Sequence, residues 1–151
     1  MGTYALTGND TLTIDNRVFK DFGNGTTITI TFPNEKTGEN TGKNGNTVFS
    51  TNTQGKNVNV ELRILAGSSD DTYLNGRLIG QDRDLPTFIL LNATFSKRIG
   101  DGNGNVKYIN YNLQGGTFKN GIDGSENLEG ETDQGIAVYK LFFAEGERAI
   151  V

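Results

Sequence analysis

Apolar and polar residues alternate most regularly in Asn57–Leu65, where every second side chain is aliphatic. Successive side chains of a strand point to opposite faces, so this pattern predicts a strand that is buried on one face only. Thr26–Phe32 alternates in the same way and follows the turn signal Asn24-Gly25. We also expect a short pair of strands at Leu12–Ile14 and Val18–Phe19, joined by an Asp-Asn turn.

Two of the later predicted strands, the first strand of a hairpin and the last strand of the chain, are apolar on both faces. Thr87–Lys97 and Val106–Leu113 flank the tight loop Gly100–Asn105, which predicts a hairpin, and Gly115–Lys119 adds a short strand. Ile136–Phe143 is the last strand that the pattern predicts. This strand and the first strand of the hairpin carry apolar residues on both sides, so each needs a cover on both sides. That cover is either the interior of a sandwich or the surface of another subunit.

One helix is expected at about residues 68–80. Ser68, with an acid three residues later, fits the start of a helix, and two consecutive aspartates suit its positive end. Leu74 and Leu78 lie four residues apart and therefore share a face, and Gly80 is a suitable last residue. We interpret this helix as a cover for one open end or face of a sheet.

The composition supports an all-β chain that forms one domain over residues 1–151. Glycine, asparagine and threonine dominate, at 21, 18 and 18 residues, whereas alanine occurs six times. Threonine favours strands, and glycine and asparagine favour tight turns. A long polar loop is predicted at about residues 34–56, and a C-terminal tail at residues 144–151. Loops of that length are commonly functional.

Several function classes are excluded by the residues that are absent. The chain has no histidine and no cysteine, which excludes serine–histidine and cysteine–histidine catalysis, ordinary zinc sites and disulfides. A net charge of −4 argues against binding nucleic acid through a basic face. The acids Asp82 and Asp84 flank Arg83, which is typical of a salt-bridged corner. We therefore expect no enzyme and no catalytic, cofactor-binding or metal-binding residue. No segment is long and apolar enough for a membrane span, so no membrane partner is expected.

The order of elements resembles a known family. The strand NVNVELRIL enters a serine-rich turn and a helix of the type SSDDTYLNGRL, within Thr47–Gly80. This arrangement resembles the tail tube proteins of contractile-tailed bacteriophages, a superfamily that includes the tubes of bacteriocins and secretion systems. The resemblance implies an antiparallel β-sandwich or small barrel with one flanking α-helix and long loops.

The resemblance also implies a structural function. It predicts that copies of the chain self-assemble into hexameric rings that stack into a tube, and that DNA passes through the lumen during genome ejection without specific binding. A sheath protein and tail terminator or initiator proteins are the implied partners. The implied location is the virion tail, after synthesis in the host bacterial cytoplasm.

Two groups of residues are the candidate contacts of such an assembly. Charged residues of the long polar loop are expected to contact the next ring: Glu35, Lys36, Glu39, Lys43 and Lys56. Apolar residues of the two-sided strands and of the tail are expected at the interface between subunits: Phe88, Leu90, Tyr139, Leu141, Phe143, Ile150 and Val151.

Other functions fit the same composition. A carbohydrate-binding β-sandwich of a receptor-binding protein would use the asparagine, aspartate and glycine loops to hold a glycan or calcium. The inner tube of a bacteriocin or secretion system is a second alternative. A connector or head-completion protein, which forms one ring and no filament, is a third.

Overall fold

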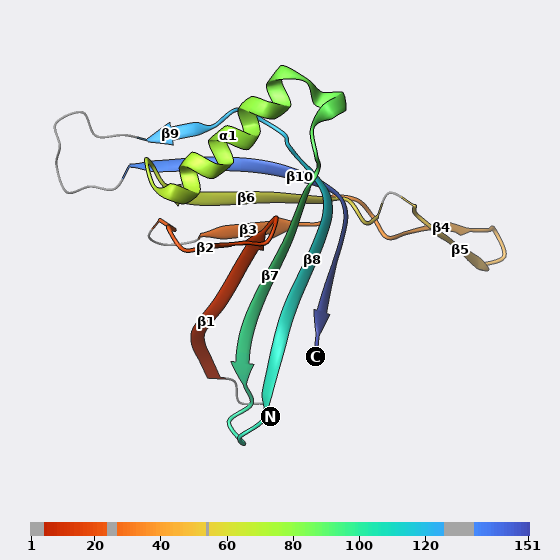
Figure 1. The fold of residues 1–151 in the computed structure, drawn as a ribbon. Helices are drawn as coiled ribbons and strands as arrows, with labels where there is room; N and C mark the ends of the chain where they lie inside the picture. The colour runs from red at the N-terminus through yellow and green to blue at the C-terminus, as the bar shows by residue number, and fades with distance from the viewer. Residues whose placement is uncertain (1–4, 24–26, 54, 126–134) are drawn as a thin grey trace.

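The computed structural model describes residues 5–23, 27–53, 55–125 and 135–151. Figure 1 shows the described elements in order along the chain. They are β1 (Ala5–Ile14), β2 (Arg17–Phe19), β3 (Ile28–Thr31), β4 (Thr37–Thr41), β5 (Thr47–Thr51), β6 (Val58–Leu65), α1 (Ser69–Arg83), the 3₁₀ helix η1 (Leu85–Thr87), β7 (Leu91–Gly100), β8 (Val106–Phe118), β9 (Asp123–Ser125) and β10 (Ile136–Ile150).

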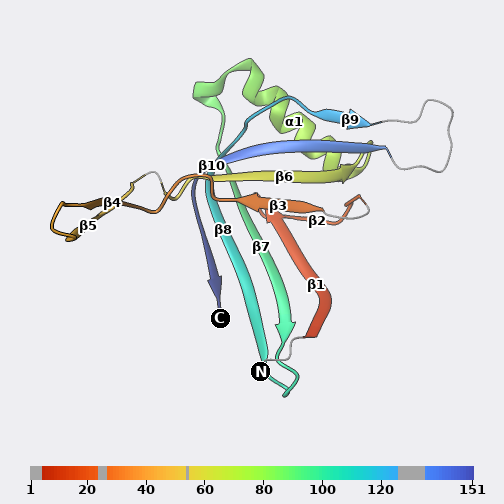
Figure 2. The same ribbon diagram turned by 180° about the vertical axis from the view of Figure 1, so that it is seen from behind.

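All strands except β4 and β5 belong to one antiparallel sheet. Its order is β2-β1-β7-β8-β10-β6-β3, and β9 pairs with the start of β10. β10 belongs to both halves of the sheet, because Ile136–Phe143 pairs with β6 and Leu141–Ile150 pairs with β8. The sheet therefore curls, so that β6 and the first half of β10 cross over the long strands β1, β7 and β8 (Figures 1 and 2).

The two ends of the sheet meet near the helix. The chain after β2 runs beside β6: the Leu65 N–H donates to the carbonyl of Asp21 at 2.9 Å, and the Gly23 N–H donates to the carbonyl of Arg63 at 3.1 Å. Phe22 forms a bridge with Ile64 between these two bonds. The sheet is therefore a half-barrel that closes at one end only.

The core lies inside this curl. The four alternating aliphatic residues Val58, Val60, Leu62 and Ile64 of β6 point inward, as the alternation predicts, and their exposure does not exceed 4%. The largest fully buried side chains are Tyr139, Phe143, Ile14, Leu62, Ile64, Leu74, Leu91, Leu113, Leu141 and Val58. Gly116 permits close packing, because a Cβ at this position would overlap the ring of Phe143.

Polar contacts hold the helix against the sheet, since Leu74 is its one buried apolar residue among those described. The carboxylate of Asp70 is 2% exposed; it accepts hydrogen bonds from the backbone N–H groups of Lys20 at 2.7 Å and Asp21 at 2.9 Å. Arg17 adds an ion pair to it at 3.1 Å. A buried carboxylate needs such partners, so Asp70 fixes the first turn of α1 on the segment that follows β2.

Two further side chains of α1 reach the sheet. Asp71 accepts a hydrogen bond from the Tyr139 hydroxyl. Burial and the Asp71 carboxylate raise the pKa of this phenol. Near the other end of the helix, the amide of Gln81 donates to the carbonyl of Phe118 at 2.9 Å and accepts from its N–H at 2.8 Å. Gln81 thus satisfies the backbone of β8 as a neighbouring strand would.

The predicted fold class is confirmed: the chain is mainly β and antiparallel, with one flanking helix. The helix begins after the expected N-cap Ser68, but it continues past Gly80 to Arg83, because the Gln81 contact holds an additional turn. The predicted strand at Thr87–Lys97 begins only at Leu91, since Pro86 lies in η1.

Two polar segments contain more structure than the sequence indicated. The predicted loop at residues 34–56 includes the hairpin β4–β5, and residues 144–150 of the predicted tail form the second half of β10. The separately predicted strand Gly115–Lys119 is part of β8, which passes through Gly115 at a positive φ of 68°.

Candidate functional site

The hairpin β4–β5, which we call the arm, projects away from the rest of the subunit (Figure 2). Val48 is 68% exposed and Phe49 is 72% exposed. Phe49 lies opposite Glu39 in the register of the hairpin, whereas Val48 lies opposite Asn40. Because successive residues of a strand point to opposite sides, each face of the arm carries one large apolar side chain. A two-stranded ribbon is only marginally stable in water, and exposed apolar side chains on both of its faces favour contact with a partner.

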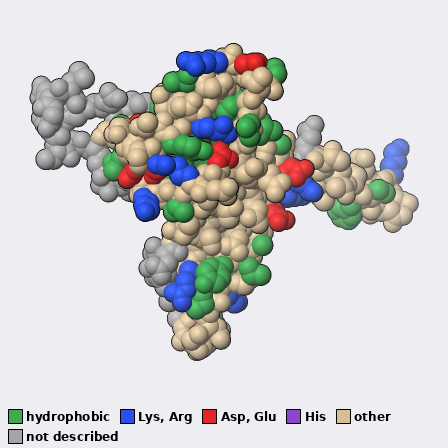
Figure 3. Space-filling model, in the orientation of Figure 1, with side chains coloured by type: hydrophobic (Ala, Val, Ile, Leu, Met, Phe, Trp, Pro, Cys, Tyr) green, Lys and Arg blue, Asp and Glu red, His purple; other side chains and the backbone are tan. Residues whose placement is uncertain are grey.

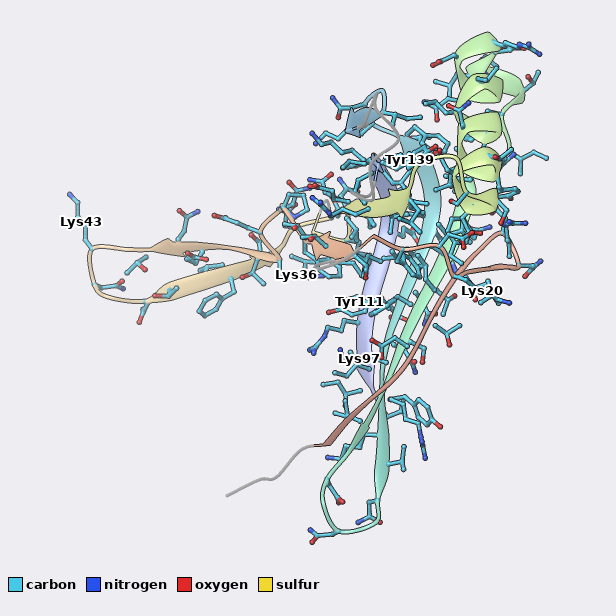
Figure 4. The ribbon with its side chains drawn as sticks, turned by 90° about the vertical axis from the view of Figure 1, so that its left-hand side faces the viewer. Lys20, Lys36, Lys43, Lys97, Tyr111 and Tyr139 are labelled. Carbon is cyan, nitrogen blue, oxygen red and sulfur yellow. The ribbon has the colours of Figure 1, made fainter. Side chains whose placement is uncertain are left out.

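The structure divides the five predicted ring-contact residues between the two ends of the arm. Glu39 lies on the outer part of the hairpin, and Lys43 lies at its tip (Figure 4). Glu35, Lys36 and Lys56 lie at its root. Lys36 and Lys56 line a cavity of about 340 Å³ together with Glu145 and Glu147 of β10. The five residues therefore form no single cluster.

A second feature is the part of the sheet that extends below the crossing strands, which we call the extension (Figure 1). It consists of β1, β7, β8 and the end of β10. β2 pairs with β1 only at Leu12–Ile14, and β6 pairs with β10 only as far as Phe143. Among the described residues, no strand covers the outer edge of β1 at residues 5–11 or the outer edge of β10 at residues 144–150.

The two open edges match one another. They have the same length, and they lie on opposite sides of the same four strands. Each of the three pairings between these strands is antiparallel, so β1 and β10 run in opposite directions. If β10 of one copy paired with β1 of the next, that pairing would also be antiparallel, and it would give the unpaired backbone groups their partners.

The two faces of the extension differ in chemistry. The face that points away from the core, which we call the polar face, carries mostly short uncharged side chains: Thr11, Thr13, Thr94, Ser96, Asn110 and Asn112. The same registers place Arg98 and Tyr108 farther out on this face and Glu147 on its β10 side. Ser96 donates a hydrogen bond to Asn110 at 2.8 Å across two strands. The opposite face continues the core downward.

A third exposed surface lies at the end of α1. Four large apolar residues there are 43 to 75% exposed: Ile79, Leu85, Ile89 and Leu90. Figure 3 shows hydrophobic side chains grouped around this end of the helix. Phe88 is half-buried beneath the guanidinium of Arg77, which lies 4.7 Å from its ring centre.

The seven predicted subunit-interface residues lie in three places. Phe88, half-buried, and Leu90, 46% exposed, belong to the surface near the end of α1, where the predicted contact stays a prediction. Tyr139, Leu141 and Phe143 are at most 1% exposed in the core of their own subunit, so they are core residues and not surface residues. These three residues share the inward face of their strand, which α1 and the crossing sheet cover, whereas Val138 and Phe142 on the other face are half-buried. Ile150 and Val151, at 53 and 73% exposed, lie at the open end of β10, where the predicted contact stays a prediction.

The polar cavity between α1 and the hairpin β1–β2 has a structural role. It measures about 380 Å³ and contains Asp15, Tyr73 and Arg77. Asp15 accepts from the Tyr73 hydroxyl at 3.3 Å, pairs with Arg77 at 3.3 Å and accepts from the N–H of Asn92 at 3.1 Å. Burial and the carboxylate raise the pKa of Tyr73. These groups bind one another, so they hold the helix to the sheet.

Neither a metal centre nor a spanning helix is present in the described part of the chain. No group of three or more metal-ligating side chains comes together there. None of the described helices has the length and apolar character needed to cross a membrane.

Comparison with known proteins identifies the fold. No family model and no curated protein sequence matches the chain. Among solved structures, a chain of the cap of the anti-feeding prophage, its tube terminating cap, has a TM-score of 0.66 at 12% identity and covers 99% of this chain and 93% of its own. A chain of the sheath–tube complex of an extracellular contractile injection system, PVC, has a TM-score of 0.63 at 12% identity, with coverage of 94% and 88%.

A chain of the sheath/tube terminator of the same system has a TM-score of 0.61 at 13% identity and covers 97% of this chain and 98% of its own. The chain therefore has the fold of tube-associated components of contractile injection systems. This fold agrees with the predicted resemblance to tail tube proteins.

Proposed function

We propose that the chain is a structural subunit of a tail tube and that copies of it form closed rings. The observation that carries this proposal is the pair of matching open edges on the extension. A contact between two different surfaces of the same chain repeats in one direction around an axis, and it closes into a ring when the rotation permits. Joining β10 of each copy to β1 of the next leaves neither edge of the extension exposed, as in a closed barrel.

The finer assignments rest on the resemblance to tail tube proteins. We propose six copies in each ring, stacking of rings through the arm, and partners of the sheath and terminator type. The similar structures support such partners, because they come from a sheath–tube complex and a sheath/tube terminator. The proposed location is a tail, in a phage virion.

The polar face of the extension is the proposed wall of the channel. The other face continues the hydrophobic core, so it is the polar face that suits contact with water and with a passing cargo. Its threonine, serine and asparagine side chains carry no charge, and the register adds one cation, Arg98, and one anion, Glu147. A wall without an excess of cations does not hold phosphates tightly, which suits a channel through which DNA slides.

An inner tube of an extracellular injection system or bacteriocin is a second candidate. The structural similarity to the injection-system proteins favours it, and a neutral channel wall does not select nucleic acid over protein. Particles purified from cells that produce the whole system would decide between the two, because DNA is packaged only with a phage tail.

Electron microscopy of the purified chain across a concentration series tests the proposal. We expect rings or hollow tubes with a regular repeat. Since some tube subunits assemble only on an initiator, the series is repeated with preformed tube ends from the native particle. A chain that stays monomeric in both series would show that the open edges are not assembly contacts.

A further inference from the structure

One face of the extension continues the core beyond the point where the subunit covers it. The strand registers place Leu12, Phe95, Tyr111 and Arg148 side by side in one row across the four strands. The next row outward is Asp10, Lys97, Ile109 and Ile150, and beyond it lie Ile99 and Lys107. Leu12 is 2% exposed and Phe95 packs against the core. The outer rows lie past this core.

We call these outer rows, together with Arg148, the basic face. Its apolar part is aliphatic: Ile150 is 53% exposed, and Ile99 and Ile109 are partly exposed. Its charged part is mainly cationic. Lys97 is paired with Asp10 at 3.5 Å, whereas Lys107 is exposed at the edge of the face.

Arg148 completes the positive rim. Its guanidinium lies 5.7 Å from the ring centre of Tyr111. The chain as a whole has a net charge of −4, so a surface with this excess of cations is unusual for it. An apolar surface with a basic rim selects a partner that is apolar and carries an acid.

The arm of the same chain has that chemistry on one of its faces. Phe49 is 72% exposed there, and Glu39 lies directly opposite it in the hairpin. The other positions of this face are threonines: Thr37, Thr41, Thr47 and Thr51. One aromatic side chain, one carboxylate and a flat set of β-branched residues match an aliphatic surface with a basic rim.

The arrangement in space points to a second copy as the partner. Figure 4 shows Lys97 and Tyr111 on the side of the extension toward which the arm projects. The arm leaves the subunit near the crossing strands and extends outward, away from its own extension (Figure 1). A copy displaced along the tube axis would bring its arm against this face.

We propose that the Phe49 face of the arm binds the basic face of a copy in the adjacent ring. Phe49 covers Ile109 and Ile150, and Glu39 pairs with Lys107 or Arg148. This inference rests on the proposed ring assembly, to which it adds the two surfaces that join one ring to the next.

Engineered disulfides test the contact, because the chain has no cysteine of its own. The test variant carries Phe49→Cys and Ile109→Cys. A second variant, Phe49→Cys with Lys107→Cys, uses an exposed position in case the change at Ile109 disturbs folding. The matched control combines Phe49→Cys with Ser96→Cys on the polar face, and another combines it with Ile89→Cys at the end of α1.

Each variant is assembled and oxidised, and its products are separated by denaturing electrophoresis without reductant. The same samples are imaged by electron microscopy. We expect cross-linked multimers from at least one of the two test variants and monomers from the controls. Tubes without cross-links in either test variant overturn the docking surface and leave ring assembly standing, and so do cross-links through position 89 or 96. A wild-type chain that forms no tubes or rings overturns the proposed function together with this inference.

Discussion

The substitution Ile150→Pro tests whether the outer edge of β10 joins two subunits. Val151 and Tyr108 exchange both of their backbone hydrogen bonds, at 3.0 and 2.8 Å. Residue pairs of an antiparallel ladder alternate between hydrogen-bonded and non-hydrogen-bonded pairs. The pair Ile150–Ile109 is therefore of the second kind, and the Ile150 N–H points away from β8 toward the open edge. Proline at this position removes an outward donor and leaves the inward ladder intact.

The expected loss is considerable at each contact between subunits. Removing the donor costs the net value of one hydrogen bond, about 1 kcal/mol, and the carbonyl left without a donor in the neighbouring copy adds about 1 to 3 kcal/mol. A total of about 2 to 4 kcal/mol per contact corresponds to association that is about 30 to 800 times weaker. The Ile150 side chain is 53% exposed, so the fold of the single subunit loses little.

Sedimentation velocity across a concentration series measures this loss, and circular dichroism measures the melting temperature of the subunit. The control Ile150→Ala removes the same side chain but keeps the N–H, so it should assemble much more readily than the proline variant. Ala149→Pro removes a donor that points inward to β8, so it should lower the melting temperature. If Ile150→Pro assembles at the same concentration as the wild-type chain, β10 is not the edge that joins subunits.

Three further substitutions test the subunit and its channel. Asp70→Asn should lower the free energy of unfolding by about 2 kcal/mol in urea titrations, because an amide cannot replace both the backbone contacts and the ion pair with Arg17. The raised pKa of Tyr139 predicts stability that is complete below pH 10 and is lost as the pH rises above that value, where the unfolded phenol ionises. The urea midpoint should therefore fall above pH 10, and it should fall less in Tyr139→Phe. Thr94→Lys should leave assembly unchanged but make tubes retain DNA at low salt and release it at high salt in filtration assays, whereas Thr94→Gln should retain none.

Much of the fold is visible in the sequence wherever a strand has one face in the core. The alternation in Asn57–Leu65 predicts β6 to within one residue, and Ser68 marks the start of α1. The end of α1 is not visible, because it depends on the contact between Gln81 and a distant strand. Local signals identify elements that the chain stabilises locally, and they fail where a tertiary contact decides.

The sequence does not predict the strands of the arm or the end of β10, for a different reason. The arm has no face in the core of its subunit, and the end of β10 reaches the core at Gly146, which has no side chain. Neither segment therefore shows the alternation of a half-buried strand. The signal that was available for the arm is Asn44-Gly45 between two threonine-rich segments, and Gly45 has a φ of 87° at the tip of the hairpin. Glu145–Arg148 offers no such signal, and its strand is defined by pairing with β8.

Tyr139 was predicted at a subunit interface and lies in the core of its own subunit for a related reason. Apolar residues on both faces of Ile136–Phe143 predicted a cover from either a sandwich interior or a second subunit, and β10 is a central strand with β6 and β8 on its two sides. Its inward side chains fill the curl, and the Tyr139 hydroxyl reaches the helix. Sequence alone does not distinguish a cover from the same chain and a cover from a neighbour.

The continuity of β10 has a consequence for how a tube would come apart. The strand supplies core residues to the subunit over its first half and an outer edge over its second half. Pairing of that edge with another copy would stabilise only the folded chain, so by mass action the melting temperature should rise with protein concentration. In an assembled tube, unfolding of one subunit's core would also break the pairing of its β10 with β1 of the next subunit. The ring, and not the single chain, would therefore be the cooperative unit of unfolding.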